Sequence, residues 1–195
     1  MKRLIDIVGA IVGLSILSII ILPIAIAIKL DSSGSIFYSQ IRCGYKGKRF
    51  RIWKFRSMVK NAEQLQYQVK NEATGAFFKN GNDPRMTKVG KFLRKTSLDE
   101  FPQFWNILKG EMSLVGTRPP TVEEVNQYNS RHHQRLNVKP GLTGIWQVCG
   151  RSKVLDFEKV VDLDLEYQQK WSILFDFYII WRTILVLFSG DSGAC

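Results

Sequence analysis

Two acidic residues stand side by side at Asp99 and Glu100, within the stretch "RKTSLDEFPQFWNILKG" of residues 94–110. One carboxylate can act as a nucleophile while its neighbour holds a divalent cation. The structural alternative is a capping box, in which Ser97 is the N-cap of a helix and Glu100 bonds back to it. Acidic residues in a first turn are also favoured by the helix dipole. On these residues alone, both interpretations stay open.

Pro102 restricts where the helix after this pair can begin. If Ser97 is the N-cap, Pro102 becomes the fifth helical residue, where its missing N–H is costly. If Asp99 is the N-cap, Pro102 falls in the first turn, where the N–H groups have no partner within the helix. In both cases we expect the two carboxylates at a helix N-terminus, whose field favours their ionised forms.

Two loops carry arginines in settings that suit phosphate binding. Residues 116–120 read "GTRPP", and an arginine held by prolines can present its guanidinium to a phosphate in bidentate fashion. Residues 138–152 read "VKPGLTGIWQVCGRS", a glycine-rich stretch in which backbone can approach a phosphate closely, with Arg151 near its end. Plain surface loops are the alternative for both, because such turns are common.

The sequence of residues 35–58 predicts a basic β-hairpin upstream of the acidic pair and the two arginine-containing loops. Two β-rich runs flank a loop with two glycines at residues 44–47, and basic residues alternate with aromatic ones in the second run. This mixture suits a single-stranded nucleic-acid groove or a surface lying on anionic lipid. An ordinary amphipathic hairpin that covers a core is a third interpretation. An apolar segment directly upstream favours lipid and phosphate over nucleic acid.

That apolar segment runs from Ile7 to Ile28 without a charged residue, about 33 Å as a straight helix. A cleaved signal peptide, a spanning helix and a re-entrant helix are the three alternatives. Lys2 and Arg3 flank one end, and Lys29 with eight further basic residues up to residue 60 flank the other. Both flanks therefore prefer the cytoplasmic side, which favours a re-entrant helix bent near Pro23.

Composition sets wider limits on the class of protein. The chain has 195 residues and a net charge of +11, which suits one domain with acidic partners such as anionic lipid or phosphorylated substrates. The three cysteines include no CxxC pair, so a zinc site is not indicated. The apolar stretch over 175–188 holds charged residues, and we expect it to be a helix packed on the membrane face or core.

Several motifs in order along the chain resemble the bacterial sugar transferases, the monotopic phosphoglycosyl transferases. The likeness extends from Lys2 to Thr183. Its motifs are the Pro-interrupted apolar helix, "KFRSM" (54–58), "DPRMTKVGKFLR" (83–94), "TSLDEFPQFWNILKGEMSLVGTRPP" (96–120), "KPGLTGIWQVCGRS" (139–152) and "LDLEYQQKWS" (163–172). The stretch around Asp99 is the most specific. Thr117 departs from the family, since many relatives have proline there.

The resemblance implies transfer of a sugar-1-phosphate from a UDP-sugar to undecaprenyl phosphate with release of UMP. The sugar implied is a hexose, glucose or galactose, added at the first membrane step of capsule or exopolysaccharide synthesis. Carried over, Asp99 is the nucleophile and Glu100 holds Mg²⁺. The substrate-binding residues expected on this basis are Lys54, Arg56, Arg85, Arg118, Pro119 and Arg151. A non-catalytic module that binds polyprenyl phosphate or anionic lipid is the alternative.

The expected architecture is a helix-rich α+β fold in two parts. Residues 1–30 form the re-entrant membrane helix, and residues 31–195 form a cytoplasmic catalytic domain with a small β-hairpin and amphipathic helices at the membrane surface. The implied location is the cytoplasmic face of the bacterial inner membrane, without a nucleic-acid partner. A homodimer is compatible with the sequence, although nothing in it requires one. Larger relatives carry additional membrane helices upstream, which suggests a small-form enzyme or an excised domain.

Overall fold

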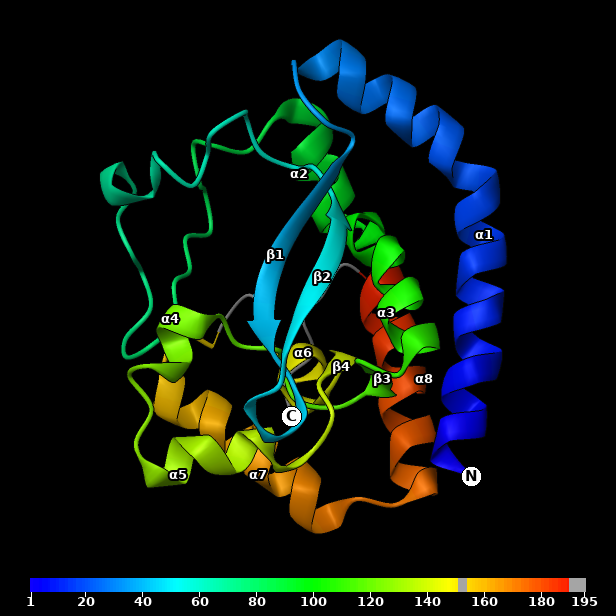
Figure 1. Cartoon of the computed structure of the whole chain (residues 1–195), viewed down its shortest axis with the longest axis vertical. Coiled ribbons are helices and arrows are strands. Elements are labelled where there is room, and N and C mark those ends of the chain that lie inside the picture. Colours follow the sequence, from blue (N-terminus) through cyan, green and yellow to red (C-terminus); the bar gives the residue numbers. More distant parts are fainter. Residues whose placement is uncertain (151–153, 190–195) are drawn as a thin grey trace.

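The computed structural model of the chain describes residues 1–150 and 154–189, and helices dominate it (Figure 1). The predicted helix-rich α+β class with a small hairpin is confirmed. The longer elements are α1 (Lys2–Asp31), β1 (Phe37–Cys43), β2 (Arg49–Phe55), α2 (Lys88–Lys95), α3 (Phe104–Lys109), α7 (Phe157–Lys170) and α8 (Ile173–Ser189). The shorter ones are η1 (Tyr45–Gly47), η2 (Gln66–Gln68), η3 (Leu98–Gln103), β3 (Ser113–Val115), α4 (Val122–Val125), α5 (Ser130–His133), η4 (Gln134–Asn137), β4 (Gly141–Thr143) and α6 (Ile145–Val148).

Helix α1 is, within residues 1–150 and 154–189, the one helix long and apolar enough to cross a membrane. Figure 1 shows α1 changing direction in its C-terminal half, the half that contains Pro23. A bend is expected there, because proline removes a backbone donor and clashes with the preceding turn. Along its outer face α1 exposes Leu4, Val8, Ile11, Val12, Ile16, Ile19, Leu22, Ile26 and Leu30. Its most apolar stretch is only 11% buried, unlike the core helix of a soluble domain.

Polar contacts attach the N-terminal end of α1 to the rest of the chain. Lys2 Nζ lies 2.5 Å from Asp176 Oδ2 on α8. Arg3 donates to backbone carbonyls at the end of α3, the shorter contact being 2.6 Å. Asp6 is buried, and its Oδ1 accepts from the Leu114 N–H of β3 at 2.8 Å. Three elements therefore hold this end of the helix, through residues at least 104 positions further along the chain: α3, β3 and α8.

The C-terminal end of α1 is attached to the same body by other residues. Arg56 is buried and donates to the carbonyls of Ser32 and Ser33, at 2.7 and 2.6 Å, just past the end of the helix. Asp31 accepts from the Val89 N–H at 2.9 Å, in the first turn of α2. Burial opposes ionisation of Asp31, yet its bond to Thr87, the largest influence, lowers the pKa of that carboxyl. Both ends of α1 are thus fixed to one domain.

The predicted hairpin forms, with β1 antiparallel to β2 in a register that pairs Phe37 with Phe55 and Cys43 with Arg49. Lys46 and Gly47 both adopt positive φ in the connecting turn, 53° and 74°, where glycine is the least strained residue. The N–H of Cys43 donates to the Pro120 carbonyl at 2.9 Å. This bond fixes the end of β1 against the arginine- and proline-containing loop of residues 116–120.

The segment that carries Asp99 begins a helix at Ser97, which is one of the two predicted starts. Ser97 is the N-cap of η3, and Asp99 and Glu100 lie in the first turn, so the predicted place of both acids at a helix N-terminus is confirmed. Ser97 has a left-handed φ of 55° and no capping bond from its side chain, so the expected capping box and the alternative Asp99 cap are wrong. Pro102 supplies the reason, because it cannot donate to the i−4 carbonyl of an α-helix. The chain instead makes a tighter 3₁₀ turn and enters α3 only after Gln103.

Two other segments depart from their sequence patterns. The sequence of residues 61–79 predicts a helix followed by irregular structure, but the structure has only turns and η2 over residues 61–68, and the irregular part follows as predicted. Asn71 explains part of this, because its Oδ1 accepts from the N–H groups of Ala73 and Lys79, at 3.1 and 2.9 Å. The parallel pairing of β3 with β4 was not predicted. A Cβ on Gly141 would lie 2.1 Å from the Gly116 nitrogen, so glycine permits this close approach.

Helix α8 also exposes apolar side chains. It buries Ile179 and exposes Leu174, Phe177, Trp181 and Leu185. Figure 1 shows α1, α3 and α8 on the same side of the molecule. The expectation of a surface helix rather than a second span agrees with this exposure and with the charged Asp176 near its start.

Candidate active site

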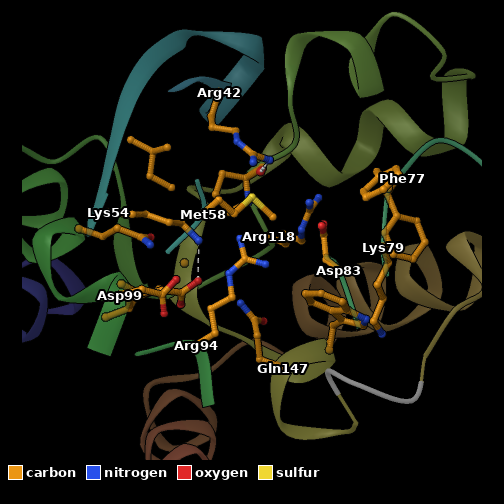
Figure 2. Close-up of a pocket in the computed structure, with 18 of the residues that line it drawn as sticks. Arg42, Lys54, Met58, Phe77, Lys79, Asp83, Arg94, Asp99, Arg118 and Gln147 are labelled. Atoms are coloured by element: carbon orange, nitrogen blue, oxygen red, sulfur yellow. Dashed lines mark hydrogen bonds and ion pairs between the residues drawn. The ribbon is translucent and has the colours of Figure 1, made fainter. Parts of the chain in front are cut away.

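A cavity of about 320 Å³ opens between the hairpin, η3, the loop of residues 116–120 and α6. Figure 2 shows its charged side chains converging from these separate segments. The basic residues that line it are Arg42, Lys54, Lys79, Arg85, Arg94 and Arg118, and the acidic ones are Asp83, Asp99 and Glu100. Six cationic side chains against three carboxylates among the described residues make this cavity suited to a polyanionic ligand.

Asp99 and Glu100 both face this cavity, as the sequence led us to expect of a reactive pair. Asp99 is only 3% exposed, so its carboxylate is shielded from most of the solvent. Glu100 Oε1 lies 2.7 Å from Lys54 Nζ, which reaches over from β2. Because η3 is a 3₁₀ helix, successive side chains diverge by about 120°. The two acids can therefore contact different groups within one ligand.

Arg118 enters the cavity from the loop of residues 116–120 with its orientation fixed. Its Nη1 donates to both carboxylate oxygens of Glu124, at 2.9 and 3.2 Å, and its guanidinium lies 5.9 Å from the Trp146 ring centroid. Glu124 also forms a capping box with Thr121 at the start of α4. Burial alone would raise the pKa of Glu124, but Arg118 reverses the effect and the pKa falls below its usual value.

A family model described as "Bacterial sugar transferase" matches residues 1–190. The chain belongs to this family. The resemblance expected from the motifs is thereby confirmed, and it covers the whole cavity as well as α1 and α8.

Relatives in the sugar transferase family differ in length from this chain. The galactosyl transferase CpsE of Streptococcus agalactiae is 51% identical over 194 residues, which cover 98% of this chain and 43% of CpsE. The UDP-glucose:undecaprenyl-phosphate glucose-1-phosphate transferase of Escherichia coli is 44% identical over 191 residues, covering 94% and 39%. The exopolysaccharide production protein ExoY of Rhizobium meliloti is 40% identical over 189 residues, covering 94% and 83%. The chain thus spans less than half of the first two relatives.

The structure brings some of the predicted sugar transferase site residues to the cavity and leaves others elsewhere. Lys54, Arg118 and Pro119 line it beside the acidic pair. Arg85 lines it too, but its guanidinium is held by Asp83, with Nη2 and Oδ2 2.6 Å apart. Arg56 does not line the cavity, because its guanidinium binds the carbonyls at the end of α1. Arg151 lies outside the described residues.

Sequence reasoning missed several polar residues that line the cavity. Arg42 and Arg94 are two, and both sit in motifs that were noticed for other reasons. Three neutral groups are the others: Gln103 Nε2, Trp146 Nε1 and Gln147 Oε1 are buried, and none has a hydrogen-bond partner within the described residues. Buried polar atoms usually have partners, so these three are available to a ligand's hydroxyl or carbonyl groups. In the sequence, the signal that could have identified Gln103 as a cavity residue was its position four residues after Asp99.

Proposed function

We propose that the chain transfers a hexose-1-phosphate from a UDP-sugar to undecaprenyl phosphate and releases UMP, at the first membrane step of capsule or exopolysaccharide synthesis. The observation that carries this proposal is the acidic pair facing a strongly cationic cavity beside an apolar surface. The names of CpsE and of the Escherichia coli relative refer to galactosyl and glucose-1-phosphate transfer. Galactose and glucose are therefore the sugars proposed for this chain.

In the first half-reaction, a carboxylate oxygen of Asp99 attacks the sugar-bearing phosphorus of the UDP-sugar. The bond between that phosphorus and the bridging oxygen breaks, and UMP leaves with the bridging oxygen. In the second half-reaction, a phosphate oxygen of the lipid attacks the same phosphorus and frees Asp99. Burial of Asp99 keeps water from competing for the acyl phosphate. Two successive displacements predict ping-pong kinetics.

The donor set near Asp99 is compatible with Mg²⁺, the proposed cofactor. Magnesium is usually bound by one or two carboxylates together with substrate phosphates and water, rather than by a full protein cage. Glu100 would supply a carboxylate ligand beside the substrate phosphates, and its Oε1 accepts a hydrogen bond from Lys54 Nζ at 2.7 Å. When bound, the ion would neutralise charge on the pyrophosphate. Lys54, which binds Glu100, and Arg118 add positive charge to the same cavity.

The attachment of α1 supports a re-entrant arrangement on the cytoplasmic face of the inner membrane. Lys2 and Asp31, at its two ends, bind the same domain through α8 and α2 respectively. A helix held at both ends by one body cannot place those ends on opposite sides of a bilayer. Its outward leucine and isoleucine side chains, together with those of α8, would enter the lipid and hold the cavity near the acceptor phosphate.

Labelling in bacterial cells tests this topology. We expect a cysteine added before Met1 and a second one at Ser33→Cys to be protected from an impermeant maleimide in intact cells. Both positions should react once the inner membrane is permeabilised, because Ser33 is exposed and α1 returns to the side from which it came. Labelling of one position alone in intact cells would instead indicate a spanning helix. A periplasmic marker protein with one cysteine controls for reagent access.

Release of UMP tests the proposed reaction. The full chain in detergent micelles should release UMP from UDP-glucose or UDP-galactose when undecaprenyl phosphate and Mg²⁺ are present, and EDTA should abolish release. We expect Glu100→Gln to need about tenfold more Mg²⁺ for half-maximal rate, since one charged ligand is lost. Glu166→Gln, an exposed change on α7, is the matched control. No release from any UDP-sugar by folded protein would favour a lipid-binding module without catalysis.

A further inference from the structure

Arg42 reaches the cavity from β1, next to the loop that carries Arg118. Its Nη1 donates to the Pro119 carbonyl at 3.1 Å. The neighbouring Cys43 N–H bonds to Pro120, and Arg42 itself forms a bridge with Thr121. The backbone at the end of β1 is therefore fixed against the loop of residues 116–120. The Arg42 guanidinium is held in the cavity by its bond to that loop (Figure 2).

The positive charge of Arg42 is poorly compensated by the protein. Burial lowers the pKa of its guanidinium to about 10, and nearby Arg118 lowers it as well, while Glu124, Tyr38 and Glu100 act in the opposite direction. The bidentate bonds of Glu124 go to Arg118, and no ion pair of Arg42 occurs among the described residues. Arg42 Nε is buried without a hydrogen-bond partner within the described part of the chain.

We propose that Arg42 and Arg118 together bind one phosphate group. The phosphate gives Arg42 the negatively charged partner that Arg118 already has in Glu124. Two guanidiniums on one cavity match the oxygens of a phosphate through several charge-assisted bonds. Trp146 lies over Arg118 and limits its movement, which preserves the plane needed for such bonds. The residue newly assigned to ligand binding is Arg42.

The identity of the phosphate rests on the proposed function. The donor brings a pyrophosphate and the acceptor brings a single phosphate, and both share the chemistry that a guanidinium recognises. If the phosphate belongs to the donor, a change at Arg42 weakens binding of the nucleotide; if it belongs to the acceptor, the change weakens binding of the lipid phosphate. Equilibrium binding can therefore identify the phosphate without any turnover.

The test compares Arg42→Gln and Arg42→Lys with Arg49→Gln, an exposed change on the same hairpin that lies outside the cavity lining. The full chain in detergent micelles is titrated with UDP and with a short-chain polyprenyl phosphate, and thermal unfolding is followed with and without inorganic pyrophosphate. We expect Arg42→Gln to weaken binding of one ligand by about ten- to a hundredfold, with a smaller effect for Arg42→Lys. Arg49→Gln should leave both affinities unchanged.

Thermal unfolding separates a binding role from a structural one. Since the surroundings disfavour the charge on Arg42, Arg42→Gln should leave the Tm of the free protein unchanged or higher and remove its rise with pyrophosphate. Weaker binding of UDP assigns the pair to the donor, and weaker binding of the lipid phosphate assigns it to the acceptor. Unchanged affinities, or no binding of either ligand by the unaltered chain, would overturn the proposal.

Two further outcomes remain decisive. If Arg42→Gln does not fold, Arg42→Lys alone tests the proposal. This variant keeps the positive charge but loses the planar guanidinium, so the proposal requires that it still weakens ligand binding. A chain that binds UDP through Arg42 but releases no UMP with lipid and Mg²⁺ would refute the proposed transferase function. The phosphate site would survive that result, so the two conclusions fail separately.

Discussion

Replacing Asp99 by asparagine is expected to abolish UMP release from the UDP-sugar, by at least about 10³-fold. The substitution keeps the size of the side chain and removes the negative oxygen that we propose attacks phosphorus. Asp99 is buried at the cavity wall, and the carboxylate of the neighbouring Glu100 is bound to Lys54. The measurement is initial UMP release with saturating donor, lipid phosphate and Mg²⁺. Activity within tenfold of the unaltered chain would remove Asp99 from the role of nucleophile.

The control for this experiment is Asp162→Asn, the same chemical change at an exposed residue of α7. It should leave UMP release unchanged. A second measurement distinguishes loss of the nucleophile from loss of the fold: Asp99→Asn should retain the Tm and the UDP affinity of the unaltered chain within a few-fold. A donor labelled in the sugar should also leave covalent label on the unaltered chain when lipid is omitted, and none on Asp99→Asn.

Local signals in the sequence predicted much of the fold. The Gly-containing turn and the β-rich runs around it specified the hairpin, since both depend on residues within a few positions of one another. The apolar run with Pro23 specified a long bent helix for the same reason. Thr121 and Glu124, three positions apart, likewise form the capping box that starts α4.

The errors arise where contacts distant in sequence decide the outcome. Arg56 follows a basic strand, and nothing within that strand indicates that it binds carbonyls at the end of α1. The pairing of β3 with β4 depends on two glycines 25 positions apart, Gly116 and Gly141. Arg42 was one basic residue among many in the hairpin. Only the packing of β1 against the loop of residues 116–120 separates it from exposed Arg49.

Removing the carboxylate of Glu124, the counterion of the cavity residue Arg118, should cause a large loss of stability. Glu124→Ala leaves the guanidinium of Arg118 without its buried counterion, which typically costs about 3–5 kcal/mol, and also removes the capping box of α4. The free energy of unfolding in denaturant measures this. Glu166→Ala breaks an exposed ion pair with Lys170 and should change stability by no more than about 1 kcal/mol. Equal losses in the two variants would contradict the argument.

The dependence on pH identifies the charge as the cause. The folded state lowers the pKa of Glu124 below its ordinary value of 4.5, so its ionised form stabilises the protein above pH 4.5. That stabilisation is lost as the pH falls below 4.5 through the folded pKa. The difference between Glu124→Ala and the unaltered chain should therefore be greatest near pH 7 and shrink progressively below pH 4.5. A difference that stays constant across this range would point to packing instead of charge.

A second substitution in the Glu124→Ala background extends the test to both arginines. Combining it with Arg118→Met should cost less than Glu124→Ala alone, because the charge of Arg118 is then removed together with its counterion. Arg42→Gln should also recover part of the lost stability, since it removes one of two guanidiniums that repel each other. Recovery by both changes would show that the charge of Glu124 offsets the positive charge of both cavity arginines. The excess positive charge is what makes the cavity ready for a phosphate.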